Sequence, residues 1–368
     1  MKILHFYKSY YPDEYGGVQQ FIRQLAHGGQ TYGIETEVLA LTPGATESVL
    51  LEQHRVHRVK RLFKAASTDF SFRALSEFRR LSADADIIHY HFPYPLADLA
   101  HFFARPKQPS VLTYHSDVVA QKKLLFLYRP LMRRFLASVS AVVASSPNYL
   151  ASSPTLRAFA DKVRCIPLGL QSNEPAAERV EYWRKRMPAR FFLFVGVFRY
   201  YKGLDFLLSA AKGLPCPIVL LGKGGQEAKL KARAAAERLE NIHFLDALSD
   251  EDKNALLSLC SALVFPSHLR SEAFGITLLE GARYGKPLVC CEIDTGTTYI
   301  NIANETGLVV PPADPAALRQ ALLTLWADEA LAARLGEGAR LRFETLFTTE
   351  KMTQSYVTLY RDLLNGRA

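Results

Sequence analysis

Two carboxylates separated by eight positions are the first candidates for chemistry in this chain. Glu272 and Glu280 flank the segment AFGITLL, which follows an apolar run ending at Pro266 and opens a run with the pattern of a helix. If every residue between them were helical, the carboxylates would lie about 12 Å apart along the axis and about 80° apart around it. That separation is wrong for sharing one metal ion or one proton, and it suits gripping two ends of an extended ligand.

The turn between these carboxylates has a second property. Phe274, Gly275 and Ile276 lie where the helix would begin, and the first backbone N–H groups of a helix have no partner inside it. Such groups attract phosphate. The alternative is structural, because the helix dipole favours a glutamate near a helix start and a surface glutamate at position 280 would be ordinary.

A second group of candidates follows the apolar run FFLFVG, which has the character of a buried parallel strand. Arg199 and Lys202 lie in the loop after it, before an amphipathic helix expected at about residues 204–212. Open α/β sheets bind ligands at the carboxyl ends of their strands. Arginine holds phosphate oxygens with a bidentate fork, and lysine adds a compact charge. Two solvated loop cations are the alternative.

Glycines follow two other expected strands. Gly16 and Gly17 come after the first strand and open a helix, and Gly222 stands between a later strand and its helix. Glycine permits positive φ and lets the backbone approach a ligand closely. The first of these loops lacks the G-x-G-x-x-G pattern, so no dinucleotide cofactor is expected. A plain turn is the alternative at both places.

Histidines occupy the ends of two expected strands. His115 directly follows the apolar run at residues 111–114, which places it at the ligand-binding edge of a sheet, although a lone histidine is more often structural. Asp117 stands two residues further on. His89 and His91 alternate on one strand face, and with no third ligand nearby we interpret them as core or edge histidines instead of a metal pair.

The elements that must position these residues alternate between short apolar runs and longer helix patterns. This alternation predicts βαβ units and parallel sheets, an α/β fold, and a length of 368 residues predicts two domains. We expect domains at residues 1–170 and 171–347, a linker at 170–181 and a terminal helix within 348–368 that crosses back to the first domain. The expected strands are residues 2–7, 35–41, 87–91, 110–114, 141–144, 163–166, 191–196, 218–221, 242–244, 262–265, 287–290 and 308–310.

Composition describes a globular protein, with 49% hydrophobic and 22% charged residues. The N-terminal run is too short for a secretory signal, and no apolar run approaches the ~18 residues of a membrane-spanning helix. Five cysteines without paired spacing favour reduced thiols over a disulfide framework or a zinc site. These features predict a cytoplasmic location.

The net charge of +9 is concentrated in the first half of the chain. Residues 1–170 contain 21 lysines and arginines against 13 acidic residues, whereas the remainder is nearly balanced. Residues 122–135 alternate basic and apolar side chains, and this pattern fits either a surface that docks on anionic lipid or a half-buried helix kinked at Pro130. Nucleic acid is a poorer candidate partner because the chain has no recognised binding motif.

Taken together, these segments resemble the retaining family 4 glycosyltransferases of the two-domain GT-B architecture. The resemblance covers nearly the whole chain and depends on the order and spacing of its motifs. Many members carry arginine directly after the glycine that ends the first strand of the second domain, whereas this chain has Val197 there and its cation is displaced to Arg199. The matching motifs are YGGV from residue 15, YHSD from 114, IPLGL from 166, the loop at 196–203, the glutamate pair at 272 and 280, and TGLVVPP from 306.

The resemblance implies two Rossmann-like, doubly wound domains facing each other across a cleft, with a nucleotide sugar held by the second. It assigns Lys202, Arg199 and the amides of residues 274–276 to the departing diphosphate. Glu272 would bind hydroxyls of the donor sugar, and Glu280 would bind the ribose.

The resemblance also implies roles for the glycine loops and for the first domain. The loop of Gly16 and Gly17 would lie over the donor diphosphate, and Gly222 would shape the nucleotide pocket. His115 would contact a hydroxyl of the transferred sugar. The position of Asp117 suggests that it faces the acceptor.

The reaction implied is transfer of a hexose to an acceptor hydroxyl with retention of configuration, by front-face attack or through a covalent intermediate. No metal or other cofactor is expected. Asp84-Ala85-Asp86 matches the D-x-D signature of metal-dependent transferases with another fold, but here it only precedes an expected strand. Ser249 and Asp252 have the spacing of a helix capping box.

The strings HSDVV from residue 115, with Gln121 and Lys122 beyond it, and TGTTY from residue 295 are similar to bacterial polysaccharide and O-antigen mannosyltransferases within the family. They imply GDP-mannose or a GDP-deoxymannose as donor, with UDP-hexoses next. The acceptor would be a lipid-linked oligosaccharide, with the enzyme peripheral on the cytoplasmic face of the inner membrane. Two alternatives are a nucleotide-sugar 2-epimerase of the same architecture and a non-catalytic nucleotide-sugar-binding protein, and the set of Glu272, Glu280, Lys202 and His115 argues against the second.

Overall fold

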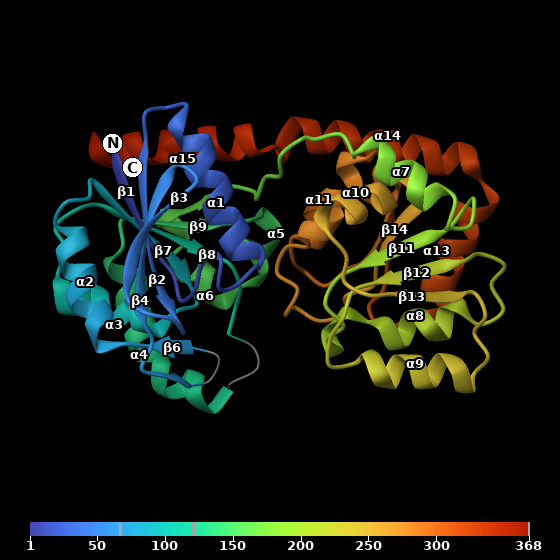
Figure 1. Cartoon of the computed structure of the whole chain (residues 1–368), viewed down its shortest axis with the longest axis horizontal. Coiled ribbons are helices and arrows are strands. Elements are labelled where there is room, and N and C mark those ends of the chain that lie inside the picture. The colour runs from blue at the N-terminus through green and yellow to red at the C-terminus, as the bar shows by residue number, and fades with distance from the viewer. Residues whose placement is uncertain (66–67, 119–121, 367–368) are drawn as a thin grey trace. The chain divides into compact units, whose positions relative to one another are not determined.

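A computed structural model describes residues 1–65, 68–118 and 122–366, and it divides the chain into two units (Figure 1). Unit 1 comprises Met1–Gln171 and Thr349–Ala368, and unit 2 comprises Ser172–Thr348. The chain therefore passes from one unit to the other twice. The segment expected as a linker, residues 170–181, is helical from Ala177 onward, because α7 (Ala177–Arg184) begins there.

Unit 1 is built on an eight-stranded sheet in the order β10-β9-β8-β7-β1-β2-β4-β3. All pairings in it are parallel except that of β3 with β4. The strands are β1 (Lys2–Phe6), β2 (Glu35–Thr42), β3 (Glu47–Leu51), β4 (His54–Lys60), β7 (Ile87–Phe92), β8 (Ser110–Tyr114), β9 (Ala141–Ala144) and β10 (Val163–Cys165); β5 (Phe63–Ala65) and β6 (Thr68–Phe70) form a separate hairpin.

The six strands expected in this part of the chain are present, but the sequence pattern does not predict β3, β4 or the hairpin. In β4, basic residues stand on either side of the valines. From the sequence alone, this pattern is typical of a solvated loop, and the strand is recognised only from its pairing. The valines Val56 and Val59 are in fact buried, while Arg55 and Lys60 are exposed. The two valines are three positions apart and therefore lie on opposite faces of the sheet, so each face of β4 carries both buried and exposed side chains.

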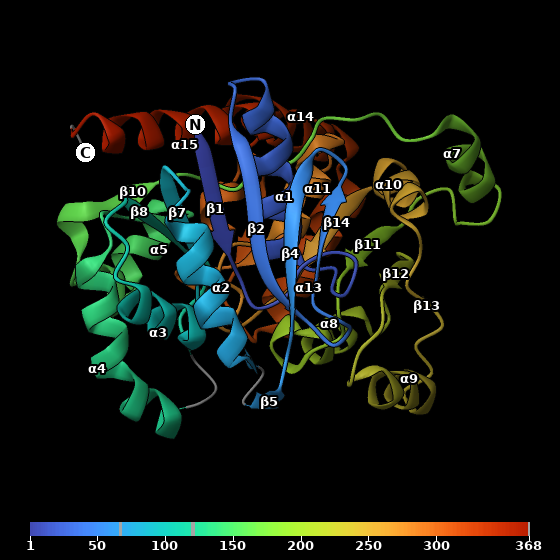
Figure 2. The same cartoon turned by 60° about the vertical axis from the view of Figure 1, so that its left-hand side comes forward.

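Helices cover both faces of this sheet (Figure 2). Helices α2, α3 and α4 pack in sequence on one side, and α1 packs against α15 on the other. The bounds are α1 (Gly17–Gln30), α2 (Phe72–Ser82), α3 (Pro95–Ala104), α4 (Lys122–Ser138), α5 (Pro147–Ser152), α6 (Pro154–Arg157) and α15 (Thr349–Leu364), with a 3-10 turn at Ala160–Lys162.

The helix α15 is an integral part of unit 1. Its residues Met352, Tyr356 and Tyr360 are at most 1% exposed. The Tyr360 hydroxyl lies 2.7 Å from His89 Nδ1, and the Tyr356 hydroxyl lies 2.8 Å from Thr113 Oγ1. The core of unit 1 is therefore completed by a helix that follows all of unit 2 in the sequence.

Unit 2 contains a parallel six-stranded sheet in the order β13-β12-β11-β14-β15-β16. Four of these strands are buried along their whole length, as their unbroken apolar runs predict. The elements are β11 (Phe192–Val195), β12 (Ile218–Leu221), β13 (Ile242–Leu245), β14 (Ala262–Phe265), β15 (Leu288–Cys291), β16 (Gly307–Val310), α8 (Leu204–Ala211), α9 (Glu227–Ala236), α10 (Asp250–Leu259), α11 (Ile276–Arg283), α12 (Thr297–Ile300), α13 (Pro315–Ala327) and α14 (Glu329–Leu346), with a 3-10 turn at Tyr200–Lys202.

Both sheets reverse their strand order in the middle. In unit 1 the reversal lies between β1 and β7, and in unit 2 it lies between β11 and β14. The loops that leave the two strands at such a point diverge to opposite faces, and ligands of open α/β sheets bind there, at the carboxyl ends of the strands. Each unit therefore has one preferred position for a site.

Candidate active site

The switch point of unit 2 brings together a lysine and a glutamate that are 70 positions apart in the sequence. Lys202 comes from the loop after β11, and Glu272 comes from the loop after β14. Lys202 Nζ lies 2.6 Å from Glu272 Oε2, and the two side chains are only 11% and 14% exposed. The Ser267 hydroxyl donates to the same oxygen over 3.4 Å. This is a nearly buried charge pair at the position where the sheet would bind a ligand.

Lys202 and Arg199 differ in their surroundings, although one loop carries both. The ammonium of Lys202 lies 4.6 Å from the centre of the Phe265 ring, a distance at which a cation is attracted by the ring face. Arg199 is exposed, as is Val197 in the position where many family members carry arginine. Lys202 is therefore the cation held by neighbouring side chains, and Arg199 is the one exposed to solvent.

Glycines allow the loops at this edge to approach one another. Gly203 has a φ of +71°, and a Cβ on it would lie 1.9 Å from the carbonyl oxygen of Pro266 in the loop after β14. Gly222 has a φ of +142°, and a Cβ there would lie 2.1 Å from the carbonyl oxygen of Gly196. Only glycine fits either position. Gly222 thus has a structural reason to be glycine, which is the close approach of the loops after β11 and β12.

The glutamate pair does not lie on one helix. Helix α11 begins at Ile276 with Gly275 as its N-cap, so Glu272 lies in the preceding loop and only Glu280 is helical. The separation calculated for a continuous helix therefore does not apply. The amides of Gly275, Ile276 and Thr277 form the start of the helix, where N–H groups have no partner within it. Phe274 is buried beside them, against Gly296 in the loop after β15.

Glu280 has a cationic partner that the sequence does not reveal. Lys253 Nζ on α10 lies 2.8 Å from Glu280 Oε1 and 2.8 Å from Asp250 Oδ1. Burial by itself lowers the pKa of Lys253, but the charges of Glu280 and Asp250 outweigh it and raise this pKa above its usual range. Lys253 therefore stays charged and forms an ion pair with Glu280. It stands in an ordinary amphipathic helix pattern, so no signal in the sequence identifies it.

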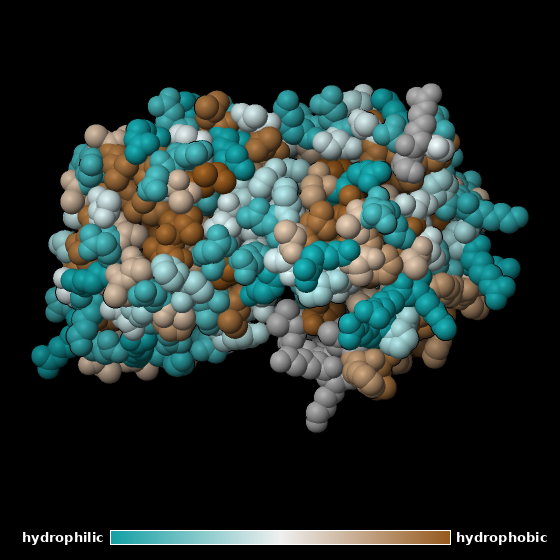
Figure 3. Space-filling model, turned by 180° about the vertical axis from the view of Figure 1, so that it is seen from behind, coloured by the Kyte–Doolittle hydropathy of each residue, from teal (hydrophilic) through white to brown (hydrophobic). Residues whose placement is uncertain are grey.

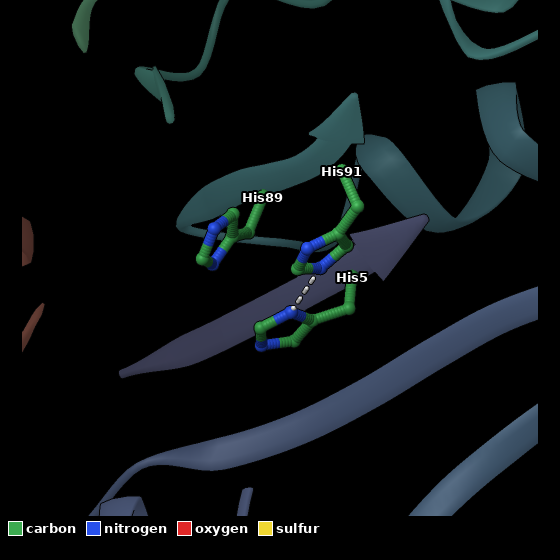
Figure 4. Close-up of side chains that lie close together, drawn as sticks. All are labelled: His5, His89 and His91. Carbon is green, nitrogen blue, oxygen red and sulfur yellow. Dashed lines mark hydrogen bonds between the residues drawn. The ribbon is translucent and has the colours of Figure 1, made fainter. Parts of the chain in front are cut away.

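The switch point of unit 1 contains a cluster of histidines (Figure 4). His5 projects from β1, and His89 and His91 project from the neighbouring strand β7; all three are at most 1% exposed. His5 Nδ1 lies 3.0 Å from His91 Nε2, and His91 Nδ1 lies 3.1 Å from Nε2 of the half-buried His115. His89 instead contacts the hydroxyls of Tyr360 and Thr113, at 2.7 Å each.

The interpretation that His89 and His91 lack a nearby third histidine is wrong, since one ring nitrogen of each of His5, His89 and His91 lies within 4.8 Å of the others. Their geometry nevertheless favours hydrogen bonds over a metal. The rings of His89 and His91 stack at 4.6 Å, and both nitrogens of His89 face hydroxyls. Burial lowers the pKa of His5 to about 3, with repulsion from His54 adding to this, and burial lowers the pKa of His115 to about 3. These rings are therefore neutral.

This neutrality predicts acid sensitivity. In the unfolded chain a histidine has a pKa of about 6.5, so as pH falls below that value the unfolded state takes up protons that the folded His5 does not. The free energy of unfolding of unit 1 should therefore be constant above pH 7 and fall below about pH 6.5, by up to about 1.4 kcal/mol per pH unit for each such histidine. Denaturant titrations between pH 5 and 8 measure this. His5→Asn should flatten the slope, whereas His243→Asn, at an exposed position, should not; a slope unaffected by His5→Asn contradicts the assignment.

The remaining candidates in unit 1 differ in exposure. Gly16 and Gly17 form the exposed N-terminus of α1, which is open to a ligand. Asp117 Oδ1 accepts hydrogen bonds from the hydroxyls of Tyr114 and Ser153, at 2.9 and 2.8 Å. Asp117 thus orders the loop after β8. Val119 and Gln121, which belong to a string similar to mannosyltransferases, lie outside the described residues.

The acidic pair before β7 is engaged with Lys2. The carboxylate of Asp86 accepts the backbone N–H of Lys2 at 2.7 Å, and that of Asp84 pairs with the Lys2 ammonium at 2.5 Å. These contacts hold the start of β1 to the start of β7, at the end of the sheet opposite the strand ends that carry His115. The interpretation of this pair as structural agrees with that position.

Comparison with known proteins shows relationships over the whole chain. Residues 15–174 match the family described as Glycosyltransferase Family 4, and residues 178–342 match that described as Glycosyl transferases group 1. The chain is 50% identical to the O-antigen chain mannosyltransferase C of Escherichia coli, over 100% of both chains. It is 51% identical to the D-rhamnosyltransferase WbpZ of Pseudomonas aeruginosa, over 95% of this chain and 92% of the relative.

Solved structures show the same fold at lower identity. The sucrose-phosphate synthase of Thermosynechococcus elongatus has a TM-score of 0.82 at 22% identity, with 99% of each chain covered. Anabaena HepE in complex with UDP has a TM-score of 0.79 at 20% identity, covering 98% of this chain and 100% of that one. The expected GT-B fold is confirmed by these neighbours.

Proposed function

The chain belongs to glycosyltransferase family 4 and has the GT-B fold, and from this premise we propose that it is a retaining transferase of mannose or a deoxymannose. The donor would be a GDP-linked sugar, and the acceptor a lipid-linked saccharide in bacterial surface polysaccharide synthesis. The two relatives near 50% identity support this sugar class, since D-rhamnose is the 6-deoxy form of D-mannose. The observation that carries the chemistry is the Lys202–Glu272 pair at the switch point of unit 2.

The physical problem of the reaction is charge. When the bond between the anomeric carbon and the diphosphate oxygen breaks, negative charge collects on the nucleoside diphosphate and positive charge on the sugar. Lys202 and the first amides of α11 are fixed donors for that anion, and Arg199 adds an exposed one. A new bond then forms from the anomeric carbon to the acceptor oxygen, and the proton of the acceptor hydroxyl passes to the departing diphosphate.

Glu272 has two roles in this proposal. In the free protein it neutralises Lys202, so that the lysine is held in place without an uncompensated buried charge. When the donor binds, the diphosphate takes over that neutralisation, and the carboxylate can accept hydrogen bonds from sugar hydroxyls. Glu280, paired with Lys253, would accept hydrogen bonds from the ribose hydroxyls.

We propose that no divalent ion takes part. Lys202 supplies positive charge where a metal would otherwise be required, and the D-x-D carboxylates are engaged with Lys2 at the start of the strands. Activity that survives excess chelator supports this, and activity that chelator abolishes and magnesium restores refutes it.

We propose that unit 1 docks on anionic lipid through α4, which suits a lipid-linked acceptor and a peripheral position on the cytoplasmic face of the membrane. Phe126 and Leu127 are 76% and 75% exposed, and Arg129, Arg133 and Arg134 are exposed on the same helix. Apolar and basic side chains combined in this way bind anionic bilayer surfaces. On the face shown in Figure 3, hydrophobic residues gather in patches with hydrophilic residues between them. Among the described helices, none is long and apolar enough to cross a bilayer.

The nucleotide and the reaction can be tested together. A thermal-shift panel of GDP, UDP, ADP and their sugars should show the largest stabilisation with GDP and GDP-mannose, because bound ligand stabilises the folded state according to its affinity. Product analysis with donor and a lipid-linked acceptor should show transfer. An altered nucleotide sugar released from donor alone would instead indicate an epimerase, and stabilisation without any turnover would indicate a binding protein.

A further inference from the structure

Three imidazoles in unit 1 form a continuous hydrogen-bonded chain that ends at His115, directly after β8 at the carboxyl edge of the sheet. It runs from His5 through His91 to His115, with nitrogen–nitrogen distances of 3.0 and 3.1 Å. The chain crosses the switch point, since β1 carries His5, β7 carries His91, and His115 follows β8. The donor residues of unit 2 play no part in it.

Water has little access to the inner part of this chain. His5 and His91 are each 1% exposed. The ring of Phe21 on α1 stands edge-on to His91 and His115, with ring centroids 5.8 and 5.4 Å apart. The two nitrogens of His91 therefore have the neighbouring histidines as partners, and each contact needs one donor and one acceptor.

A neutral imidazole carries one N–H, so the chain has two consistent arrangements. In the first, His5 Nδ1 donates to His91, His91 Nδ1 donates to His115 Nε2, and the hydrogen of His115 is on Nδ1. In the second every direction is reversed, and Nδ1 of His115 is an acceptor. Mixed arrangements place two hydrogens or two lone pairs face to face in a dry interior, which leaves buried polar groups unsatisfied.

We propose that the contacts through His91 to His5 couple the tautomers of the three rings, so that the direction of the chain decides whether Nδ1 of His115 donates to or accepts from a sugar hydroxyl. The ligand-facing part of this inference rests on the proposed function together with the role that the family resemblance implies for His115, contact with a hydroxyl of the transferred sugar. His115 Nε2 is occupied by His91, so Nδ1 is the nitrogen left for a ligand. His5 and His91 are positioning residues, because they act through His115 and not on the substrate.

His89 shows why the chain is more than a cluster of buried histidines. It lies on the same strand, is 0% exposed, and its ring is 4.6 Å from that of His91. Its nitrogens face the hydroxyls of Thr113 and Tyr360, and a hydroxyl rotates to donate or to accept. Either tautomer of His89 can therefore be satisfied by rotation of two hydroxyls, whereas in the chain a change of tautomer in one ring requires a change in the next ring. His89 provides a matched control.

The test is a histidine-labelled ¹⁵N spectrum of the full chain at pH 7 without ligand, in which protonated and bare ring nitrogens have distinct shifts. Wild type should show, across each of the two contacts, one protonated and one bare nitrogen. His5→Leu removes the first partner and should move the His115 nitrogens toward an averaged tautomer. His5→Asn, whose amide can occupy the place of Nδ1, and His89→Asn should both preserve the wild-type His115 shifts.

Activity provides the second readout. His5→Leu should lower kcat/KM for the donor sugar at least tenfold, leave the affinity for the nucleoside diphosphate unchanged, and be rescued by His5→Asn. Two outcomes would overturn the proposal: a wild-type spectrum with like nitrogens facing each other, or a His115 tautomer that is the same in His5→Leu as in wild type. The spectra need no substrate, so they test the hydrogen-bonded histidine chain even if the proposed reaction is wrong. If His5→Leu does not fold, the wild-type spectrum and His5→Asn still decide.

Discussion

Replacement of Lys202 by alanine will lower kcat by two to three orders of magnitude, the loss of about 10²–10³ that follows removal of one fixed donor to developing charge. Lys202 is the enclosed cation at the switch point of unit 2, and the diphosphate anion appears only as the glycosidic bond breaks. Lys202 therefore stabilises the transition state more than it stabilises the ground state. Steady-state kinetics with donor and acceptor measures the change.

Two companion variants separate charge from fold. Lys202→Ala leaves Glu272 with Ser267 alone, so its thermal unfolding must be measured beside its activity. Lys202→Gln keeps an N–H donor and removes the charge, and it should be nearly as inactive. Lys229→Ala removes an exposed lysine paired with Asp205 in the same unit and should retain wild-type kcat. Near-normal transfer by folded Lys202→Ala would exclude this lysine from catalysis.

Replacement of Glu280 by alanine will weaken binding of the nucleoside diphosphate roughly 10- to 100-fold, because a hydrogen bond to a charged group contributes about 1.5–3 kcal/mol. The effect should appear equally with free nucleoside diphosphate and with the nucleotide sugar, since the ribose is common to both. Calorimetric titration of the variant with GDP gives the affinity.

Asp250→Ala is the matched control for this change. Both Asp250 and Glu280 hold Lys253, so each substitution removes one partner of the same lysine, but only Glu280 is assigned to the ribose. Asp250→Ala should therefore leave the affinity for GDP unchanged. If both variants lose affinity equally, the loss comes from Lys253, and the ribose contact is refuted.

The strands that position the site of unit 2 are predictable from sequence because they are buried on both faces and therefore apolar throughout. The run FFLFVG is one example, and the structure forms β11 within it. The segment His54–Lys60 is the opposite case. Its basic residues stand between two valines that are buried on opposite faces of the sheet, so no alternation marks it as a strand and only its pairing with β2 identifies it.

The partners within the sites are less predictable than the site residues. Lys202 and Glu272 each stand out by their place after an apolar run, but their pairing follows from β11 and β14 being neighbours in the sheet. His5 is the only polar residue besides Lys2 in the run KILHF, and its contact with His91 requires the parallel pairing of β1 and β7. Lys253 lies in a solvated helix pattern and is recognised only when α10 and α11 are adjacent. The spacing of residues in the sequence predicts which of them lie at the carboxyl edge of a sheet. The order of the strands in the sheet determines which of these residues contact one another.

Helix α15 carries a consequence for how this protein is made. During translation the ribosome finishes all of unit 2 before it produces Tyr356 and Tyr360, yet these tyrosines supply hydroxyls to Thr113 and His89 in a sheet synthesised long before. The apolar surface of unit 1 that α15 covers therefore stays exposed while about half of the polypeptide is still being synthesised. A partly folded chain with such a surface is prone to aggregation. We therefore expect this delay to lower the expression yield and to make folding depend on chaperones. A fragment ending before residue 349 would lack α15, so the apolar surface of unit 1 would stay uncovered.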